Sequence, residues 1–134
     1  MSGKFITQAD MKWGKSPIGR DAIVSSPIET GAKNIMVIDA VFEPGKQHSF
    51  HHHPNQEEVI YVTEGVLEQW IEGEKKYLKA GDSCFIPAGM VHASFNSSDA
   101  DARIIAILSP AIGEEGYEVE DVFDRPPWNT MRPE

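Results

Sequence analysis

The sequence predicts an all-β protein, a sandwich or barrel built from short strands. Clusters of turn-forming residues such as SPIG, EPGK, TEG, KAGD and PAGM recur at short, fairly even intervals. Runs rich in Val, Ile, Phe and Tyr lie between these clusters, and no stretch before Gly113 has the periodicity of a long amphipathic helix. A chain of 134 residues is the size of one domain with one core.

The first clear strand is predicted at residues 35–42, IMVIDAVF. Its alternate residues form a wholly apolar face: Met36, Ile38, Ala40 and Phe42. Asp39 lies among the other positions, and this period of two indicates a strand with one face turned into the core.

The remaining strands follow in chain order. They are predicted in EEVIYVTEG (57–65), in VLEQWIEGEKKYL (66–78), which turns at Glu72-Gly73, in DSCFIP (82–87), in HASFN (92–96) and in RIIAIL (103–108). RIIAIL is apolar on both faces and should be a central strand. In the tail YEVEDVFDRPPWN (117–129) we expect a short helical turn, ended by Pro126 and Pro127.

Composition narrows the possible partners and the compartment. The formal net charge of −9 argues against nucleic acid and anionic membranes, both of which require a cationic face. The N-terminus has no apolar signal region and no run is long enough to span a bilayer, so we expect a cytoplasmic protein. Cys84 is the single cysteine; it cannot form an intramolecular disulfide and should be a small buried hydrophobe.

Histidines and acids gather in GKQHSFHHHPNQEEVIYVTEG, residues 45–65. On a strand, His51 and His53 leave the same face, as metal chelation requires. Glu58 shares its parity with apolar residues, and a carboxylate facing the core is costly unless it is paired or bound to a metal. His92 opens a distant apolar strand and by itself would suit a hydrogen-bonded core histidine. A surface histidine tract is the alternative, but it would not account for the second block described next.

Two separated blocks match a known pattern. The first, G-x5-H-x-H-x4-E-x6-G, is met at Gly45, His51, His53, Glu58 and Gly65. The second, G-x5-P-x-G-x2-H-x3-N, is met at Gly81, Pro87, Gly89, His92 and Asn96. On these residues the chain resembles the cupin superfamily over roughly residues 35–108.

The resemblance implies a single double-stranded β-helix, or jelly-roll barrel, spanning 1–134, with an N-terminal arm (1–34) and a C-terminal tail (109–134). It implies one metal ion inside the barrel, and the implied ligands are His51, His53, Glu58 and His92. It also suggests a homodimer, with residues 5–19 as an arm on the partner. By parity His52 should point away from the site and Asn96 should line the interior, while His48 should be solvated before the strand.

A set of three imidazoles and one carboxylate suits a divalent first-row ion such as Mn, Fe, Co, Ni, Cu or Zn. Four protein ligands around an octahedral ion leave two positions for a chelating substrate, or for substrate and O2. By analogy with cupins, we expect a metal-dependent oxidoreductase of dioxygenase type acting on a small oxygenated substrate, with Glu58 as the catalytic residue that also moves a proton. The alternatives are an isomerase, lyase or hydrolase of sugar-acid-like molecules, and a barrel that only binds a ligand.

The sequence offers several candidates for residues that contact the substrate. Ile60 and Val62 would give an apolar wall, and only one of Gln69 and Trp70 can face inward. The other candidates are Arg103, which suits a carboxylate substrate or a surface ion pair, and Tyr117 and Trp128, which suit the mouth of the barrel or a dimer contact. Tyr61 should face away.

Overall fold

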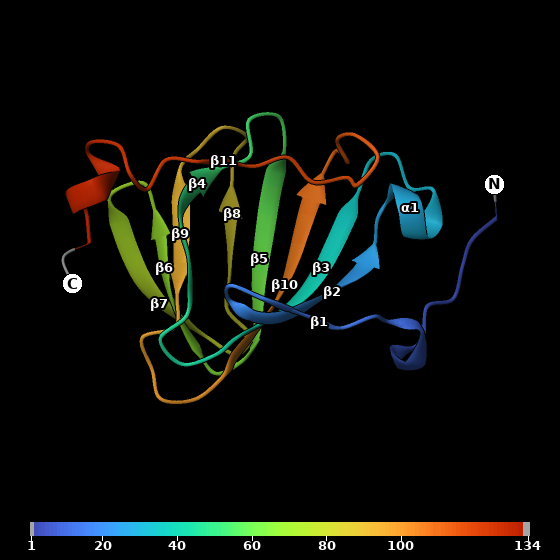
Figure 1. Cartoon of the computed structure of the whole chain (residues 1–134), viewed down its shortest axis with the longest axis horizontal. Coiled ribbons are helices and arrows are strands. Elements are labelled where there is room, and N and C mark those ends of the chain that lie inside the picture. The colour runs from blue at the N-terminus through green and yellow to red at the C-terminus, as the bar shows by residue number, and fades with distance from the viewer. Residues whose placement is uncertain (1, 133–134) are drawn as a thin grey trace.

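Two antiparallel sheets face one another across the core (Figure 1). The computed structural model describes residues 2–132. One sheet has the order β1 (Gly14–Ser16), β2 (Gly19–Ser25), β3 (Met36–Phe42), β10 (Ala102–Ser109), β5 (Glu57–Glu64), β8 (Ser83–Ile86). The other has the order β11 (Glu120–Asp121), β4 (Gln47–His52), β9 (His92–Phe95), β6 (Val66–Ile71), β7 (Glu74–Lys79). This two-sheet arrangement confirms the all-β prediction.

The register of the central strand explains the core. β10 pairs with β3 on one side and with β5 on the other, so Ile104 lies between Ala40 and Val62. Residues of one parity on these three strands are buried together: Met36, Ala40, Phe42, Ile60, Val62, Ile104, Ala106 and Leu108. The alternation seen in the sequence therefore marks the inner face of the larger sheet, as predicted.

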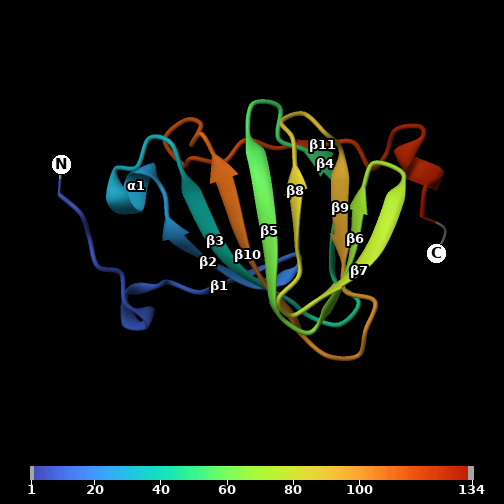
Figure 2. The ribbon, with the colours of Figure 1, turned by 180° about the vertical axis from the view of Figure 1, so that it is seen from behind.

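The N-terminal region contributes two strands to this sheet. β2 pairs with β3, and β1 pairs with β2 at the sheet edge, so the sheet extends N-terminally beyond residue 35. Residues 2–13 contain one 3-10 turn (Gln8–Asp10) and run out past the helical turn α1 (Pro27–Thr30), as Figure 2 shows. The side chain of Phe5 in this segment is fully exposed. Its docking on a partner subunit stays a prediction.

The C-terminal segment crosses one end of the barrel (Figure 1). The helical turn expected before the prolines is wrong: β11 forms there and pairs with β4, and the 3-10 turn η2 (Trp128–Thr130) begins after Pro127. A second apolar cluster holds this segment against the outside of the smaller sheet; its members include Phe50, Trp70, Phe95, Val122 and Trp128. Within residues 2–132, no helix is long and apolar enough to cross a membrane.

Candidate metal centre

Three histidines converge between the two sheets. His51 lies in β4, His53 directly follows β4, and His92 opens β9 opposite His51. One ring nitrogen of each lies within 4.8 Å of those of the other two. All three residues are 3% exposed or less. The two-residue spacing of the first pair and the pairing of β4 with β9 bring this cluster together.

Each imidazole is fixed by a backbone carbonyl. Nδ1 of His51 lies 2.6 Å from the Ser49 oxygen, Nδ1 of His53 lies 2.7 Å from the Glu118 oxygen, and Nδ1 of His92 lies 3.0 Å from the Met90 oxygen. A carbonyl can only accept, so every Nδ1 carries the proton. In the neutral imidazole the lone pair then lies on Nε2, the arrangement typical of metal-binding histidines.

Glu58 brings a carboxylate oxygen to the same place. Its Oε1 lies 3.3 Å from Nε2 of His53 and 3.0 Å from Nε2 of His92. These three atoms are buried and none makes a hydrogen bond. Two donor atoms each about 2.1 Å from one ion, at a right angle, would lie about 3.0 Å apart. The unpartnered atoms and their spacing therefore fit a shared cation.

The protonation states also suit metal binding. Burial, and then the neighbouring His48, keep the pKa of His51 well below its ordinary value, so that ring is neutral. Burial opposes ionisation of Glu58, but the contacts with His53 and His92 outweigh it and lower the pKa of that carboxyl to about 2. Burial alone would lower the pKa of His53, yet the Glu58 charge raises it above its ordinary value.

His48 lies closer to the centre than expected. It is part of β4, is partly buried, and stacks on His51 with ring centroids 3.5 Å apart. The prediction that His48 precedes the strand and is solvated is wrong, because β4 begins at Gln47 and the ring is partly buried against His51. His52 points away as expected, and its Nε2 lies 2.7 Å from the Glu120 carboxylate.

Asn96 is buried but does not line the cavity. Its Nδ2 donates to the carbonyls of Phe42 and Ala100, and its Oδ1 accepts from the backbone N–H of Ser98. Its role is thus to organise the loop after β9, contrary to the expectation from parity.

A cavity of about 530 Å³ opens from the cluster and runs between the sheets. One wall is apolar and comes mostly from β3, β5 and β10: Met36, Ile38, Ala40, Phe42, Ile60, Ile104 and Ala106. Polar residues of β4 and β9 face it: Gln47, His48, His51, His92 and Ser94. Among residues 2–132, no lysine or arginine lines this cavity.

The structure places each remaining candidate for substrate contact either inside or outside the barrel. Gln69 faces inward, where its Oε1 accepts a hydrogen bond from Ser94, whereas Trp70 lies in the outer apolar cluster. Arg103 pairs with Asp39 through two hydrogen bonds of 2.9 and 2.7 Å on the outer face, so the carboxylate-binding role is wrong and the ion pair is right. Tyr61 is 41% exposed and faces away.

Two aromatic residues of the C-terminal segment have different surroundings. Tyr117 lines the cavity and packs edge-on against His53, with ring centroids 5.1 Å apart. Trp128 stacks on Phe50 in the outer cluster, 5.5 Å between centroids, and so lies outside the cavity lining. Of these two candidates, only Tyr117 is placed to meet a ligand.

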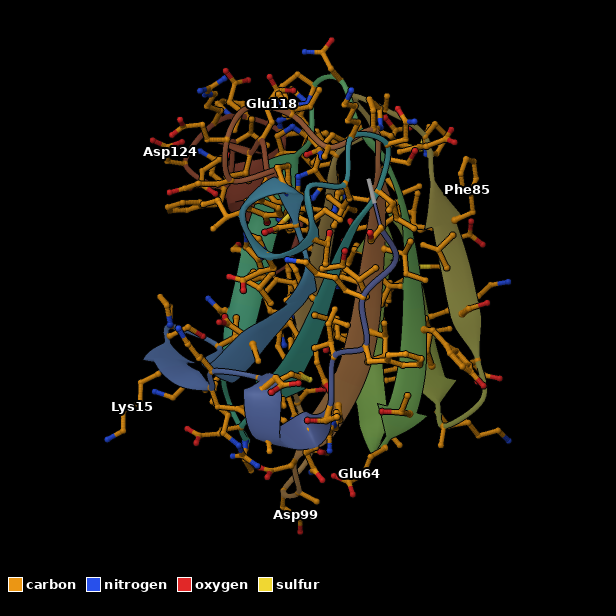
Figure 3. All side chains as sticks on the ribbon, turned by 90° about the vertical axis from the view of Figure 1, so that its right-hand side faces the viewer. Lys15, Glu64, Phe85, Asp99, Glu118 and Asp124 are labelled. Atoms are coloured by element: carbon orange, nitrogen blue, oxygen red, sulfur yellow. The ribbon has the colours of Figure 1, made fainter. Side chains whose placement is uncertain are left out.

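Sequence reasoning missed the support that the C-terminal segment gives to the centre. Gln56, only 1% exposed, donates through Nε2 to the carbonyls of Pro110 and Gly116 and accepts through Oε1 from the N–H of Glu118. These bonds place the Glu118 carbonyl against His53; Glu118 lies at the same end of the barrel as the crossing segment (Figure 3). Every residue has a backbone carbonyl, so the sequence does not reveal which carbonyl contacts His53. The position of Gln56 between the candidate ligands His53 and Glu58 was the one available signal.

Comparison with known proteins agrees with this architecture. The chain is 39% identical over 85 residues to the polyketide synthase CurC of Streptomyces cyaneus, a match that covers 63% of this chain and 55% of CurC. The structure of the polyketide cyclase RemF from Streptomyces resistomycificus superposes with a TM-score of 0.74 at 19% identity, over 97% of this chain and 99% of RemF. KdgF from Halomonas sp. gives a TM-score of 0.74 at 24% identity, over 84% of this chain and 98% of KdgF. At these identities, the two structures support the fold alone.

The family comparison concerns the barrel strands. The chain spans little more than half the length of its curated relative CurC. The model of the cupin domain matches residues 39–108, more than half of the 134 residues, and this stretch contains all three clustered histidines and Glu58. The chain is therefore a member of the cupin family.

Proposed function

We propose that this cupin is a metal-dependent enzyme, an oxidoreductase of dioxygenase type, whose substrate is a small and largely apolar molecule with neighbouring oxygen atoms. One observation carries the proposal. Three buried atoms, Nε2 of His53, Nε2 of His92 and Oε1 of Glu58, have no hydrogen-bond partner and lie together, and Glu58 and His92 also line the cavity. Leaving a buried polar group without a hydrogen-bond partner costs about 1–3 kcal/mol. A site that served only packing would therefore not be expected to keep three such groups together.

The ligand set fits one divalent first-row ion held by His51, His53, Glu58 and His92. Such an ion, when bound, would polarise a substrate oxygen and, if redox-active, would exchange electrons with O2. The protein itself supplies the apolar wall of β3, β5 and β10, which binds the hydrocarbon part of the substrate and excludes water.

Two side chains are placed to handle protons. Glu58 is held ionised, with its pKa lowered to about 2, so its carboxylate is available to accept a hydrogen bond from a substrate hydroxyl. Burial, and then the Glu58 charge, raise the pKa of Tyr117 well above its ordinary value. Its phenol therefore stays protonated at the cavity and donates a hydrogen bond to a substrate oxygen.

A second candidate is a metal-dependent reaction without O2, such as the closure of a ring. It is favoured by the relative described as a polyketide synthase and by the similar fold of a polyketide cyclase. Isomerisation or hydrolysis of a sugar acid has less support, because no cationic side chain of residues 2–132 lines the cavity to meet a carboxylate. A barrel that only binds a ligand would not need the buried, unpartnered donor atoms.

The test begins with the metal content of untagged protein, measured by mass spectrometry after purification without added metal. We expect about one first-row ion per chain in the wild type, as one site requires, and its loss in a His51→Ala/His92→Ala double variant. His52→Ala is the matched control, because this neighbouring histidine points away and should keep the metal. A wild type that stays empty even after reconstitution would contradict the metalloenzyme and leave the ligand-binding barrel.

The reaction class is tested next with simple vicinal diols such as substituted catechols. The proposed oxidation consumes O2 at a rate that depends on bound metal and on Glu58, so Glu58→Gln should be slow while Glu57→Gln, on the exposed side of β5, should not. Product formation under argon would contradict the dioxygenase and support the second candidate.

A further inference from the structure

The β1–β2 hairpin presents two polar side chains to the cavity. Ser16 and Asp21 both line it, together with the metal-centre residues His51, Glu58 and His92. The Ser16 hydroxyl oxygen is buried and makes no hydrogen bond. The Asp21 side chain is half-buried and makes neither a hydrogen bond nor an ion pair with any of residues 2–132. Two unpartnered polar groups in one cavity point to a ligand that satisfies them.

These groups are far from the metal centre along the sheet. Asp21 lies opposite Ala40 in β3, and β10 separates β3 from β5, which carries Glu58. Three strand spacings correspond to about 14 Å along a flat sheet, so Ser16 and Asp21 belong to a different part of the cavity wall from Glu58. The apolar side chains of β3 and β10 fill the interval between the two polar ends.

The charge around the hairpin decides which ligand fits. Lys15 and Arg20 are cross-strand partners with exposed side chains, and Figure 3 shows Lys15 projecting away from the barrel. The other carboxylates that line the cavity, Glu29 and Glu115, add negative charge to it, and no lysine or arginine of residues 2–132 lines it. A second carboxylate brought beside Asp21 would therefore meet like charge without a compensating cation.

We propose that Ser16 and Asp21 form a second binding subsite that holds a hydrogen-bond donor, a hydroxyl or an ammonium group, at the end of the substrate remote from the metal. The subsite selects an elongated molecule with chelating oxygens at one end and a donor at the other, and it rejects molecules with a carboxylate there. This inference rests on the proposed function, since the same cavity must hold the substrate.

The probes are biphenyl-3,4-diols that differ only at the 4′ position, which carries a hydroxyl, a methoxy or a carboxylate group. Their binding to the Zn(II)-loaded protein is measured by calorimetry, so that no turnover intervenes. A hydrogen bond to a charged acceptor corresponds to about a tenfold or greater preference, so the 4′-hydroxyl compound should bind at least that much more tightly than the 4′-methoxy compound. The 4′-carboxylate should bind most weakly.

Asp21→Asn should abolish most of this preference and improve the binding of the carboxylate, and Ser16→Ala should reduce the preference in part. Glu57→Gln removes one charge outside the cavity and should behave as wild type. Zinc content and far-UV circular dichroism are measured on each variant; a loss of zinc in Asp21→Asn would place its effect at the metal centre and overturn the subsite.

Different results would contradict the subsite and the proposed function. If the wild type takes up zinc and binds all three diols alike, or if Asp21→Asn keeps the full preference, the subsite is overturned and the proposed function stands. If the wild type takes up no metal and binds no diol, the proposed function itself is contradicted.

Discussion

The Glu118 carbonyl accepts a hydrogen bond from Nδ1 of His53 at 2.7 Å, across 65 residues of sequence. Glu118 lies outside the stretch matched by the cupin-domain model, and His53 lies within it. The orientation of one metal-centre imidazole thus depends on a segment that the barrel strands do not include. Gln56 holds that segment in place through three hydrogen bonds to its backbone.

We expect Gln56→Glu to weaken metal binding. The new carboxylate cannot donate to the carbonyls of Pro110 and Gly116, so the Glu118 carbonyl loses its fixed position against His53. Loss of support around a ligand typically lowers metal affinity about 10–100-fold, measurable by competition with a chromogenic chelator. Asn55→Ala, which removes only contacts with the Glu118 carboxylate, is the control. Equal affinities in Gln56→Glu and wild type would contradict this role.

The stability of the metal-free protein should fall in mild acid because of His48. Burial lowers the pKa of this imidazole in the folded protein from 6.5 to about 4. The unfolded chain therefore binds a proton that the folded chain does not, between these two pH values, and stability is lost as the pH falls from 6.5 to 4.

The change attributable to His48 is up to about 3 kcal/mol in the free energy of unfolding. Urea titrations at several pH values, with wild type beside His48→Gln, measure it. The variant should show a flatter pH dependence in this window. The pKa of Glu58 is lowered to about 2, so its titration changes the free energy of unfolding only below its ordinary pKa of 4.5. It therefore does not account for the difference between wild type and His48→Gln. Parallel curves for both proteins would rule out His48 as the cause.

Cys84 should be an unreactive thiol near neutral pH. Burial, and then the charge of Glu58, raise its pKa to about 11. Because the thiolate is the nucleophile, alkylation by iodoacetamide should still accelerate above pH 9, whereas an ordinary thiol with a pKa of about 8.5 levels off. The same protein unfolded in urea is the reference. A plateau near pH 9 in the folded protein would show that the thiol is not shielded.

Two signature glycines should differ in their tolerance of a side chain. Both have positive φ, +75° at Gly65 and +78° at Gly45, but a Cβ at Gly65 would collide with the backbone of Asp101 and Ala102 while one at Gly45 meets open space. Gly65→Ala should cost about 3 kcal/mol or more, and Gly45→Ala about 1 kcal/mol, the strain of the left-handed backbone alone. Urea unfolding of both variants measures the difference, and equal losses would mean that the collision is relieved by movement of the loop.

The sequence was informative where side chains carry the signal. Alternation in residues 36–42 predicted the inner face of the sheet, because burial acts on every second side chain of a strand, and the apolar run at 103–108 predicted a central strand. The spacing of the histidines placed them on one face in the same way. The strand at residues 19–25 was missed because Asp21 turns inward, which breaks the apolar alternation. The part played by Glu118 is carried by its main chain, so no pattern of residue types predicts it.

The order of synthesis gives the contact between His53 and Glu118 a further consequence. When β3 to β10 have left the ribosome, all four candidate ligands are present, yet the carbonyl that fixes His53 is still to be made. The centre reaches its final geometry only when residues 116–118 have docked on Gln56. We therefore expect tight uptake of the proposed metal ion to be a late event in folding, after the C-terminal segment has reached its place.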